Sequence, residues 1–270
     1  MRDPLDVRRL VAGLPSSDGW AAPVVRDEVG STNVLARELG VRWQPVLAER
    51  QVAGRGRLGR DWHEVPRAGL AVSVVVPRVD PPGWLPLATG LAVRDAVAAR
   101  GVAADLKWPN DVLLPGDDHR KVCGILCELD VARGQVVVGV GINVDHAREE
   151  LPVPTASSLR LALAGGPPPS SGGGATGLDR TALAVDLLGR LRRLHTALAE
   201  GGPAAAAVRA AYETACTTIG AVVDVHLPGG TVEREEVTGV DRDGALRLRG
   251  RSASLGAGDV RHVRPVTSQP

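Results

Sequence analysis

The sequence predicts an α+β fold, in which a mixed, largely antiparallel sheet with helices on one side is followed by a small C-terminal β-barrel. Two observations lead to this prediction. Strand-like apolar runs joined by hairpin-length turns dominate residues 104–144. Towards the C-terminus, short strand-like runs alternate with turn sequences such as Pro228-Gly229-Gly230 and Asp243-Gly244. We therefore expect a larger domain over residues 1–217 and a small one over residues 218–270.

The N-terminal half is expected to alternate strands and helices. Ser31 and Thr32 are favoured at a helix N-terminus, and Gly40 favours the C-terminal end of the same helix. The apolar run from Leu70 to Val76 has the length of a buried strand. The expected elements are, in order, a helix over 5–14, a strand from 24, a helix over 31–40, strands over 45–49 and 70–76, and a helix over 84–99.

The C-terminal half begins with strands and continues into two helices. Asp179 is a favourable N-cap for a long helix whose leucines recur at helical spacing. Residues 165–174 consist of Gly, Pro and Ser, a composition typical of a flexible surface loop. The expected elements are strands over 105–107, 112–114, 121–129 and 135–144, helices over 180–199 and 203–216, and strands over 222–227, 231–240 and 245–248.

Charge and cysteine content limit the classes of function. The net charge is +1, from 32 basic and 31 acidic residues, so a general affinity for polyanions is excluded and any anion site is local. The three cysteines, the lack of a secretory leader and the lack of an apolar run of ~18 residues predict a cytoplasmic protein. Cys123 and Cys127 share one strand face, where we expect buried structural thiols, with a metal pair as the alternative.

Residues 54–60 have the sequence Gly-Arg-Gly-Arg-Leu-Gly-Arg, which is too highly charged for the core. Glycine lets a ligand approach the main chain, and arginine offers a planar fork of donors to carboxylate or phosphate. The run is therefore either a solvated loop or an anion clamp, and we expect residues 54–67 to be mobile until anions bind. Its match to the dinucleotide-binding pattern G-x-G-x-x-G is accidental, because Pro66 blocks the helix that should follow.

Three further segments place polar or small residues at the ends or on one face of an element. Lys107 ends a strand and is either a ligand contact or a solvent-facing lysine. Gly139 and Gly141 open one face of a strand, for a ligand or for a packed helix. The helix start at 31–33 has hydroxyls and free amides that either cap the helix or bind an acceptor-rich ligand.

Together, these segments resemble biotin–protein ligases, which attach biotin to a lysine of biotin-dependent carboxylases. The matching runs are Gly-Ser-Thr-Asn at 30–33, the Gly/Arg run at 54–60, Lys-Trp-Pro-Asn-Asp at 107–111, Lys-x-x-Gly-Ile-Leu-x-Glu at 121–128 and Gly-Val-Gly-Ile-Asn at 139–143. They stand in the order that the family has, and the resemblance extends over residues 24–265.

The resemblance implies a catalytic domain with the fold of class II aminoacyl-tRNA synthetases and a C-terminal barrel of the SH3-like kind. It implies that biotin and ATP, with Mg²⁺, form biotinyl-5′-AMP. The acceptor would be the biotin carboxyl carrier domain of acyl-CoA or pyruvate carboxylases.

The resemblance also implies roles for individual residues. Lys107, Arg55 and Arg57 would be catalytic. Biotin would contact Ser31, Thr32, Asn33, Gln51, Gly54, Arg55, Gly56, Arg57, Lys107, Gly124 and Gly141. The nucleotide would contact Arg57, Arg60, Lys107, Asn110, Lys121 and Asn143. The metal ligands are not identified, and Asp111 either aids magnesium binding or forms a turn.

Some members of this family carry an N-terminal helix-turn-helix and repress transcription. Such a module needs about 50 residues or more, and the first catalytic strand is expected here from residue 24. We therefore expect the monofunctional type, without specific DNA binding or membrane association. A lipoate ligase and a non-enzymatic binding protein are the alternatives. A biotin-dependent pyrophosphate-release assay, with lipoate as the second acid, separates all three.

Overall fold

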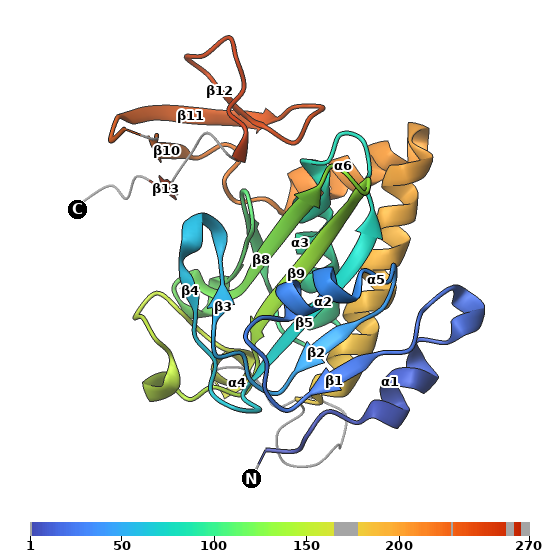
Figure 1. Ribbon diagram of the computed structural model, residues 1–270. Coiled ribbons are helices and arrows are strands. Elements are labelled where there is room, and N and C mark those ends of the chain that lie inside the picture. Colours follow the sequence, from blue (N-terminus) through green and yellow to red (C-terminus); the bar gives the residue numbers. More distant parts are fainter. Residues whose placement is uncertain (1, 165–177, 228, 258–261, 266–270) are drawn as a thin grey trace.

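A seven-stranded mixed sheet forms the centre of the computed structural model (Figure 1), which describes residues 2–164, 178–227, 229–257 and 262–265. The strand order is β1-β2-β5-β9-β8-β7-β6. β1 and β2 are parallel, and every other neighbouring pair is antiparallel, as expected. The strands are β1 (Val24–Arg26), β2 (Val46–Ala48), β5 (Gly69–Pro77), β6 (Asp105–Lys107), β7 (Asp111–Leu114), β8 (Arg120–Asp130) and β9 (Gln135–Asn143).

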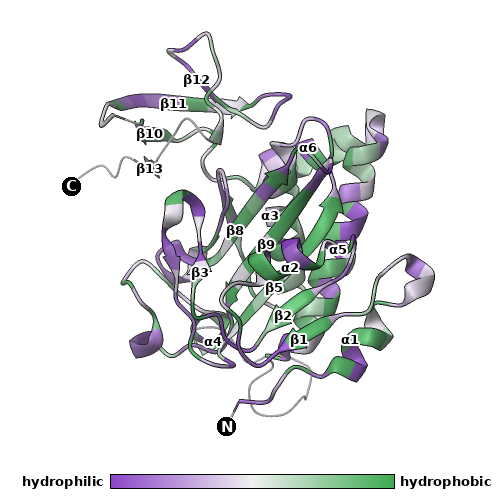
Figure 2. Ribbon diagram, in the orientation of Figure 1, coloured by the Kyte–Doolittle hydropathy of each residue, from purple (hydrophilic) through white to green (hydrophobic). Residues whose placement is uncertain are grey.

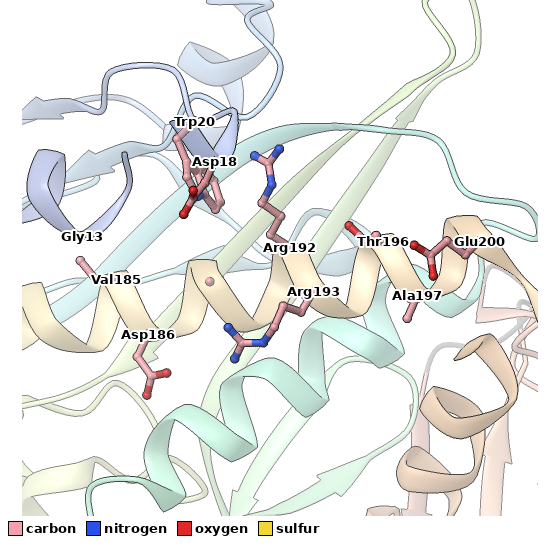
Figure 3. Close-up of a pocket in the computed structure, with 11 residues that line it drawn as sticks. Gly13, Asp18, Trp20, Val185, Asp186, Arg192, Arg193, Thr196, Ala197 and Glu200 are labelled. Carbon is pink, nitrogen blue, oxygen red and sulfur yellow. The ribbon is translucent and has the colours of Figure 1, made fainter. Parts of the chain in front are cut away.

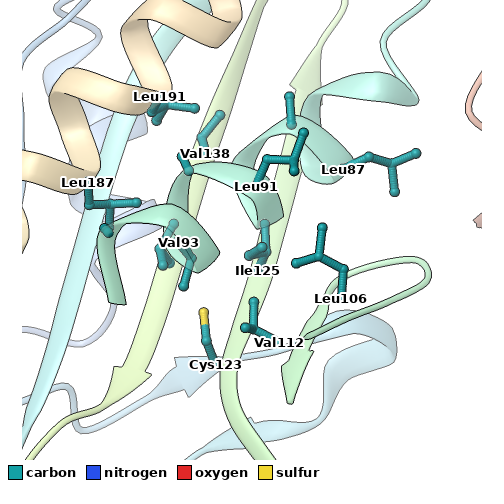
Figure 4. Close-up of a cluster of buried hydrophobic side chains, with 14 of the residues drawn as sticks. Leu87, Leu91, Val93, Leu106, Val112, Cys123, Ile125, Val138, Leu187 and Leu191 are labelled. Carbon is teal, nitrogen blue, oxygen red and sulfur yellow. The ribbon is translucent and has the colours of Figure 1, made fainter. Parts of the chain in front are cut away.

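One face of the sheet carries the main core. Helices α3 (Trp84–Ala98) and α5 (Arg180–Glu200) cover this face. Leu91 of α3 and Leu187 of α5 belong to the same buried cluster as Val138 and Ile125 of the sheet (Figure 4). Strand residues alternate between the two faces of a sheet, so the apolar side chains at every second position form this core.

The opposite face carries α2 (Thr32–Leu39) and a short hairpin of β3 (Gly54–Arg55) and β4 (Asp61–Trp62). Ala36 of α2 packs in a second, smaller cluster with Val46, Val75 and Val137, which lie on the other side of the strands from the main core. The expectation that all helices lie on one side of the sheet was therefore wrong for α2. This helix has a narrow buried face, made of Thr32, Asn33 and Ala36, and that face lies against the sheet.

The structure describes three further helices. They are α1 (Val7–Gly13), α4 (Leu159–Ala164) and α6 (Gly202–Ala215), with short 3-10 turns η1 (Ser16–Asp18), η2 (Arg57–Gly59), η3 (Pro115–Asp117) and η4 (Arg148–Glu150). The Asp179 side chain accepts from the Ala182 N–H and caps α5, which confirms its predicted role. The predicted surface loop at 165–174 lies outside the described residues.

The C-terminal strands form a separate four-stranded antiparallel sheet in the order β12-β11-β10-β13. The strands are β10 (Val222–His226), β11 (Val232–Val240), β12 (Leu246–Leu248) and β13 (His262–Pro265). The turn between β11 and β12 touches the main body, where Trp84 Nε1 donates to the Arg242 carbonyl (2.8 Å) and Trp108 Nε1 to the Gly244 carbonyl (3.1 Å). Closure of this sheet into an SH3-like barrel, and the boundary at residue 217, stay predictions.

The distribution of apolar and polar residues over the elements agrees with this arrangement. Figure 2 shows the central strands mainly in the apolar colour and the β3–β4 hairpin mainly in the polar colour. In the parts of the chain that the structure describes, no helix is long and apolar enough to cross a membrane.

Candidate active site

A polar cluster of Thr32, Asn33, Gln51 and Ser73 lies where α2 meets the sheet. The parallel pairing of β1 and β2 continues into a bridge between Val29 and Gln51, which brings the start of α2 beside Gln51. The Gln51 Oε1 atom accepts from the Thr32 N–H (2.8 Å) and the Thr32 hydroxyl (2.9 Å). These are residues that the sequence assigned to biotin, and the structure brings them together.

Ser73 completes the polar cluster from β5. Its hydroxyl is fully buried and lies 2.7 Å from Thr32 Oγ1 and 2.6 Å from Asn33 Oδ1. Ser31 is buried at the N-cap of α2, and its side chain makes no capping bond within the described residues. The hydroxyl and amide groups of this cluster can bind a small polar ring that has both donors and acceptors.

Asn33 anchors α2 to the sheet. Its Nδ2 atom donates to the Leu126 carbonyl (3.3 Å) and to Glu128 Oε2 (2.6 Å). A Cβ atom at Gly139 would overlap the Asn33 amide oxygen, so this glycine makes room for the helix. Helix packing, the alternative left open for Gly139, is therefore what the structure shows, and a ligand contact of Asn33 stays a prediction.

The Gly/Arg run folds as the β3–β4 hairpin with η2 at its tip. Leu58 and Gly59 have left-handed φ values of 58° and 71°, which reverse the chain. The Gly56 N–H donates to the Arg60 carbonyl (2.7 Å), and a Cβ atom at Gly54 would come within 2.7 Å of the Trp62 carbonyl. The glycines thus permit a tight hairpin, while Arg55 and Arg60 are exposed.

Trp62 at the end of this hairpin lies over the sheet. A Cβ atom at Gly141 would come within 2.5 Å of its ring, and one at Gly124 within 3.0 Å. Lys121 Nζ lies 5.8 Å from the centre of the same ring. Gly124 and Gly141, both predicted site residues, therefore lie directly under the aromatic ring of the arginine hairpin.

Cationic groups gather around Asp111 beside this ring. Lys121 Nζ forms an ion pair with Asp111 Oδ1 at 2.6 Å, and Lys107 is the register partner of Asp111 in the β6–β7 ladder. Burial lowers the pKa of Arg57, the charge of Asp111 raises it and that of Arg60 lowers it, so Arg57 lies within the electrostatic reach of both. Arg57 also donates to the Ala257 carbonyl of the C-terminal region.

A crevice too narrow to hold a water molecule lies next to these cations. It is lined by Lys107, Asn110 and Asp111 and, on its apolar side, by Leu106, Ile125 and Tyr212. Lys107 ends β6, as predicted, and borders this crevice, while its ligand contacts stay predictions.

Two predicted nucleotide contacts have structural partners of their own. Asn110 Nδ2 donates to the Ile125 carbonyl (2.9 Å), which holds the turn between β6 and β7. Asn143 is buried, and its Nδ2 atom donates to the Ser157 carbonyl (2.9 Å). Their nucleotide contacts stay predictions.

No group of three or more His, Cys, Asp or Glu side chains suited to a metal ion occurs in the described ranges. Cys123 and Cys127 are free thiols, and burial raises the pKa of Cys127 to about 12 and that of Cys123 further. They are structural thiols. Mg²⁺ commonly binds through substrate phosphates with one or two carboxylates, and Asp111 is the carboxylate among these cations.

The residues predicted for the site did not include Ser73, Trp62, Glu128 or Glu64, whose carboxylate accepts from the Gln51 main-chain N–H (2.8 Å) and from Trp62 Nε1 (3.2 Å). Ser73 had a signal, because it is the polar residue in the apolar run from Leu70 to Val76. The other three depend on which strands become neighbours, so their partners cannot be seen in the sequence alone.

A separate surface hollow lies on α5, which covers the other face of the sheet (Figure 3). It is lined by residues such as Asp18, Trp20, Arg192 and Arg193. The Arg192 guanidinium carbon lies 5.1 Å from the ring centre of Trp20 and 4.6 Å from that of Trp43. This stacking fastens the N-terminal segment to α5, away from the polar cluster.

Comparison with known proteins gives consistent matches. The sequence model of the biotin/lipoate A/B protein ligase family matches residues 42–145. A biotin–[acetyl-CoA-carboxylase] ligase of Mycobacterium tuberculosis is 39% identical over 98% of this chain and 98% of its own length. The bifunctional ligase/repressor BirA of Escherichia coli is 36% identical over 54% of this chain and 44% of its own length.

Solved structures show the same fold. The biotin protein ligase of Aquifex aeolicus in complex with biotin and ATP has a TM-score of 0.74 at 25% identity, covering 90% of this chain and 99% of that chain. The biotin protein ligase of Leishmania major in complex with biotinyl-5-AMP has a TM-score of 0.58 at 25% identity, covering 91% of this chain and 98% of that chain.

Proposed function

The chain belongs to the biotin protein ligase family and is an enzyme of that family, and we propose that it joins biotin to an acceptor lysine in two steps, on the face of the sheet that carries α2. In the first step the biotin carboxylate attacks the α-phosphate of ATP, which releases pyrophosphate and forms biotinyl-5′-AMP. In the second step the ε-amine of an acceptor lysine attacks the acyl carbon, and AMP leaves.

One observation supports this proposal above the others: the polar cluster and the cations around Asp111 flank a single aromatic ring. Trp62 Nε1 and Gln51 Nε2 of the polar cluster both donate to Glu64 Oε1, and Lys121 Nζ lies 5.8 Å from the centre of the Trp62 ring. Biotin has a polar ring at one end and a carboxylate at the other. A ligand whose ring binds at Thr32 and Gln51 would direct its carboxylate toward the cations.

Two anions must meet in the first step, so cationic groups are needed at the point where they meet. We assign this role to Lys107, with Arg57 holding the adenylate and Arg55 and Arg60 closing over the ligands. Lys121 is already paired with Asp111, so it would reach a phosphate by exchanging that partner. Mg²⁺ would arrive with ATP as part of the substrate, with Asp111 as its one carboxylate contact.

We assign the acceptor to the biotin carboxyl carrier domain of biotin-dependent carboxylases, by analogy with the name of the M. tuberculosis relative. We propose no sequence-specific DNA binding, because the net charge of +1 gives no general attraction to polyanions.

The test is pyrophosphate release from Mg·ATP with biotin, with lipoate or with no acid. The proposal requires release with biotin alone, followed by a mass increase of one biotinyl group on an added carrier domain. Release with lipoate instead would assign the chain to lipoate ligation, which the same family model covers. Release with neither acid would refute ligation.

A further inference from the structure

Glu64 lies at the base of the arginine hairpin, just beyond β4, and its carboxylate receives three N–H groups. The Gln51 main-chain N–H donates to Oε2 (2.8 Å), and Gln51 Nε2 donates to Oε1 (3.2 Å). The third donor is the indole Nε1 of Trp62, also 3.2 Å from Oε1. Gln51 precedes the hairpin and Glu64 follows it, so these bonds join the two ends of the hairpin.

The bond from Gln51 Nε2 to Glu64, together with a bond from Thr32, gives the Gln51 amide a single orientation. Thr32 offers an N–H group, which can pair only with the amide oxygen. An ionised carboxylate only accepts, so Glu64 can pair only with the amide nitrogen. The side chain is thereby held from both ends, with its oxygen toward α2 and its nitrogen toward the hairpin.

Trp62 is held in the same way. Its ring lies over Gly141 and Gly124, and its one polar atom is bonded to Glu64. An indole has a single donor, so the loss of Glu64 would leave this N–H without its partner. The ring would then be free to turn away from the sheet.

We propose that Glu64 is a positioning residue of the biotin subsite, which fixes the Gln51 amide and the Trp62 ring before the ligand arrives. This inference rests on the proposed function, because it takes Gln51 and Trp62 as part of that subsite. Preorganisation improves affinity by reducing the entropy lost on binding. Removal of Glu64 should therefore weaken biotin binding while leaving the chemical step, which depends on Lys107, nearly unchanged.

The arrangement also predicts a pH dependence. Burial raises the pKa of Glu64 above that of an ordinary glutamate, and the N–H bonds from Gln51 and Trp62 and the charge of Arg180 partly oppose this. Arg180 of α5 is itself paired with Glu49, His63 is the exposed neighbour in sequence, and Lys121 lies near the Trp62 ring. Protonation would place an O–H donor against the donors of Gln51 and Trp62, so biotin affinity should fall as the pH falls.

The experiment measures biotin affinity by calorimetry, and KM and kcat of adenylate formation, over about pH 5–8. The variants are Glu64→Ala and Glu64→Gln. Glu28→Gln serves as the matched control, because Glu28 is an exposed carboxylate paired with Arg50, the residue next to Gln51. His63→Gln controls for the neighbouring imidazole, and thermal melting reports folding.

We expect Glu64→Ala to raise KM and Kd for biotin about 10-fold or more, the scale of hydrogen bonds to a charged group, with kcat within about 2-fold. Glu64→Gln keeps one accepting oxygen, so its loss should be about 3-fold. Its affinity should also no longer fall on acidification, whereas the wild-type and both control proteins should keep that dependence.

Three results separate the possibilities. An active wild-type enzyme with the same biotin KM in folded Glu64→Ala would overturn the positioning role alone. If Glu64→Ala does not fold, the positioning role is equally overturned when the biotin affinity of Glu64→Gln depends on pH as that of the wild type does. A wild-type protein that neither binds nor activates biotin refutes the proposed function and, with it, this inference.

Discussion

Lys107 is the residue on which the proposed chemistry depends most. It ends β6 opposite Asp111 and lines the narrow crevice beside it. Lys107→Gln removes the charge and keeps a donor of similar length, so adenylate formation should fall roughly 100- to 1000-fold. Single-turnover kinetics at saturating biotin and ATP measure this, with thermal melting as the folding control. Adenylate formation at the wild-type rate would make Lys107 a structural lysine.

Gly139 shows how one missing side chain shapes the site. A methyl group there would overlap the amide oxygen of Asn33, which is bonded to Ser73 and cannot move freely. Gly139→Ala should cost about 1–3 kcal/mol of stability and raise KM for biotin, because α2 would shift away from Gln51.

Gly30 supplies the control for this substitution. A Cβ atom at Gly30 would meet no atom within 4 Å among the described residues, so Gly30→Ala should be nearly neutral. Equal melting temperatures for Gly139→Ala and the wild type would show that α2 does not depend on this contact.

Some residue roles could be predicted from the sequence, and others could not. Lys107 and Thr32 stand in recognisable runs, and the structure brings Thr32 together with Gln51, while the ligand contacts of all three stay predictions. Glu64 and Ser73 act through hydrogen bonds to residues that other elements supply, so their roles depend on the register between strands. That register follows from the packing of the whole sheet and not from the local pattern.

At the scale of elements, a buried ion pair connects the arginine hairpin to the helices. Arg180 at the start of α5 lies 2.8 Å from Glu49, and both side chains are almost fully buried, at 6% and 5% exposure. Arg180 also donates to the carbonyls of Gly69 (3.0 Å) and Asp3 (2.6 Å). Glu49 and Gly69 bracket the segment that contains the hairpin, so this pair fixes both of its ends.

Breaking that pair should be costly. Arg180→Met leaves a buried carboxylate unpaired and should reduce stability by about 3–5 kcal/mol. The double variant Arg180→Met/Glu49→Gln should recover a large part of the loss, since no uncompensated charge remains. The exposed pair Arg9–Asp179 is the control, and Arg9→Met should reduce stability far less, because water screens an exposed pair. Urea unfolding measures all three, and equal losses in the two single variants would contradict this account.

The elements themselves were largely predictable, and their placement was not. The apolar runs at 70–76 and 135–144 predict β5 and β9. Asp179 predicts where α5 begins, and Gly40 predicts where α2 ends. The side of the sheet that α2 occupies is set by a few small contacts around Ala36 and Gly139. The mobility expected of residues 54–67 without ligand stays a prediction.

At the scale of the whole molecule, the N-terminal arm and the loop after β9 meet in a charged cluster that should respond to acid. Arg2 bonds to Asp145 (2.9 Å) and to Glu150 (2.5 Å). The bond from Arg2, with the Ala147 N–H, lowers the pKa of Glu150 to about 2. Burial, with Arg2, lowers the pKa of the adjacent His146 to about 4 from its ordinary 6.5.

Both shifts make the folded state bind fewer protons than the unfolded chain, so stability decreases as the pH decreases. For His146 the loss begins below its unfolded pKa and continues down to about pH 4, amounting to about 2 kcal/mol between pH 7 and 5. The contribution of Glu150 is lost at still lower pH, down to about 2. His146→Gln should flatten the fall in melting temperature over pH 7–5, and an unchanged slope would contradict the assignment.

The fold class and the division into a large and a small sheet followed from patterns that extend over many residues. The contact between the two sheets did not, because it depends on two indole N–H groups that meet main-chain carbonyls of the turn between β11 and β12. Such contacts leave no periodic trace in a sequence. They place the C-terminal sheet against Trp108, directly next to Lys107.

We have proposed that biotin is joined to the α-phosphate of ATP on the face of the sheet that carries α2. The most direct measurement is a single-turnover reaction of the purified protein with biotin and Mg·ATP labelled at the α-phosphate. The account predicts that the label appears in biotinyl-5′-AMP, in an amount close to that of the protein, and moves to AMP when a carrier domain is added. Label that stays in ATP at saturating biotin would contradict it.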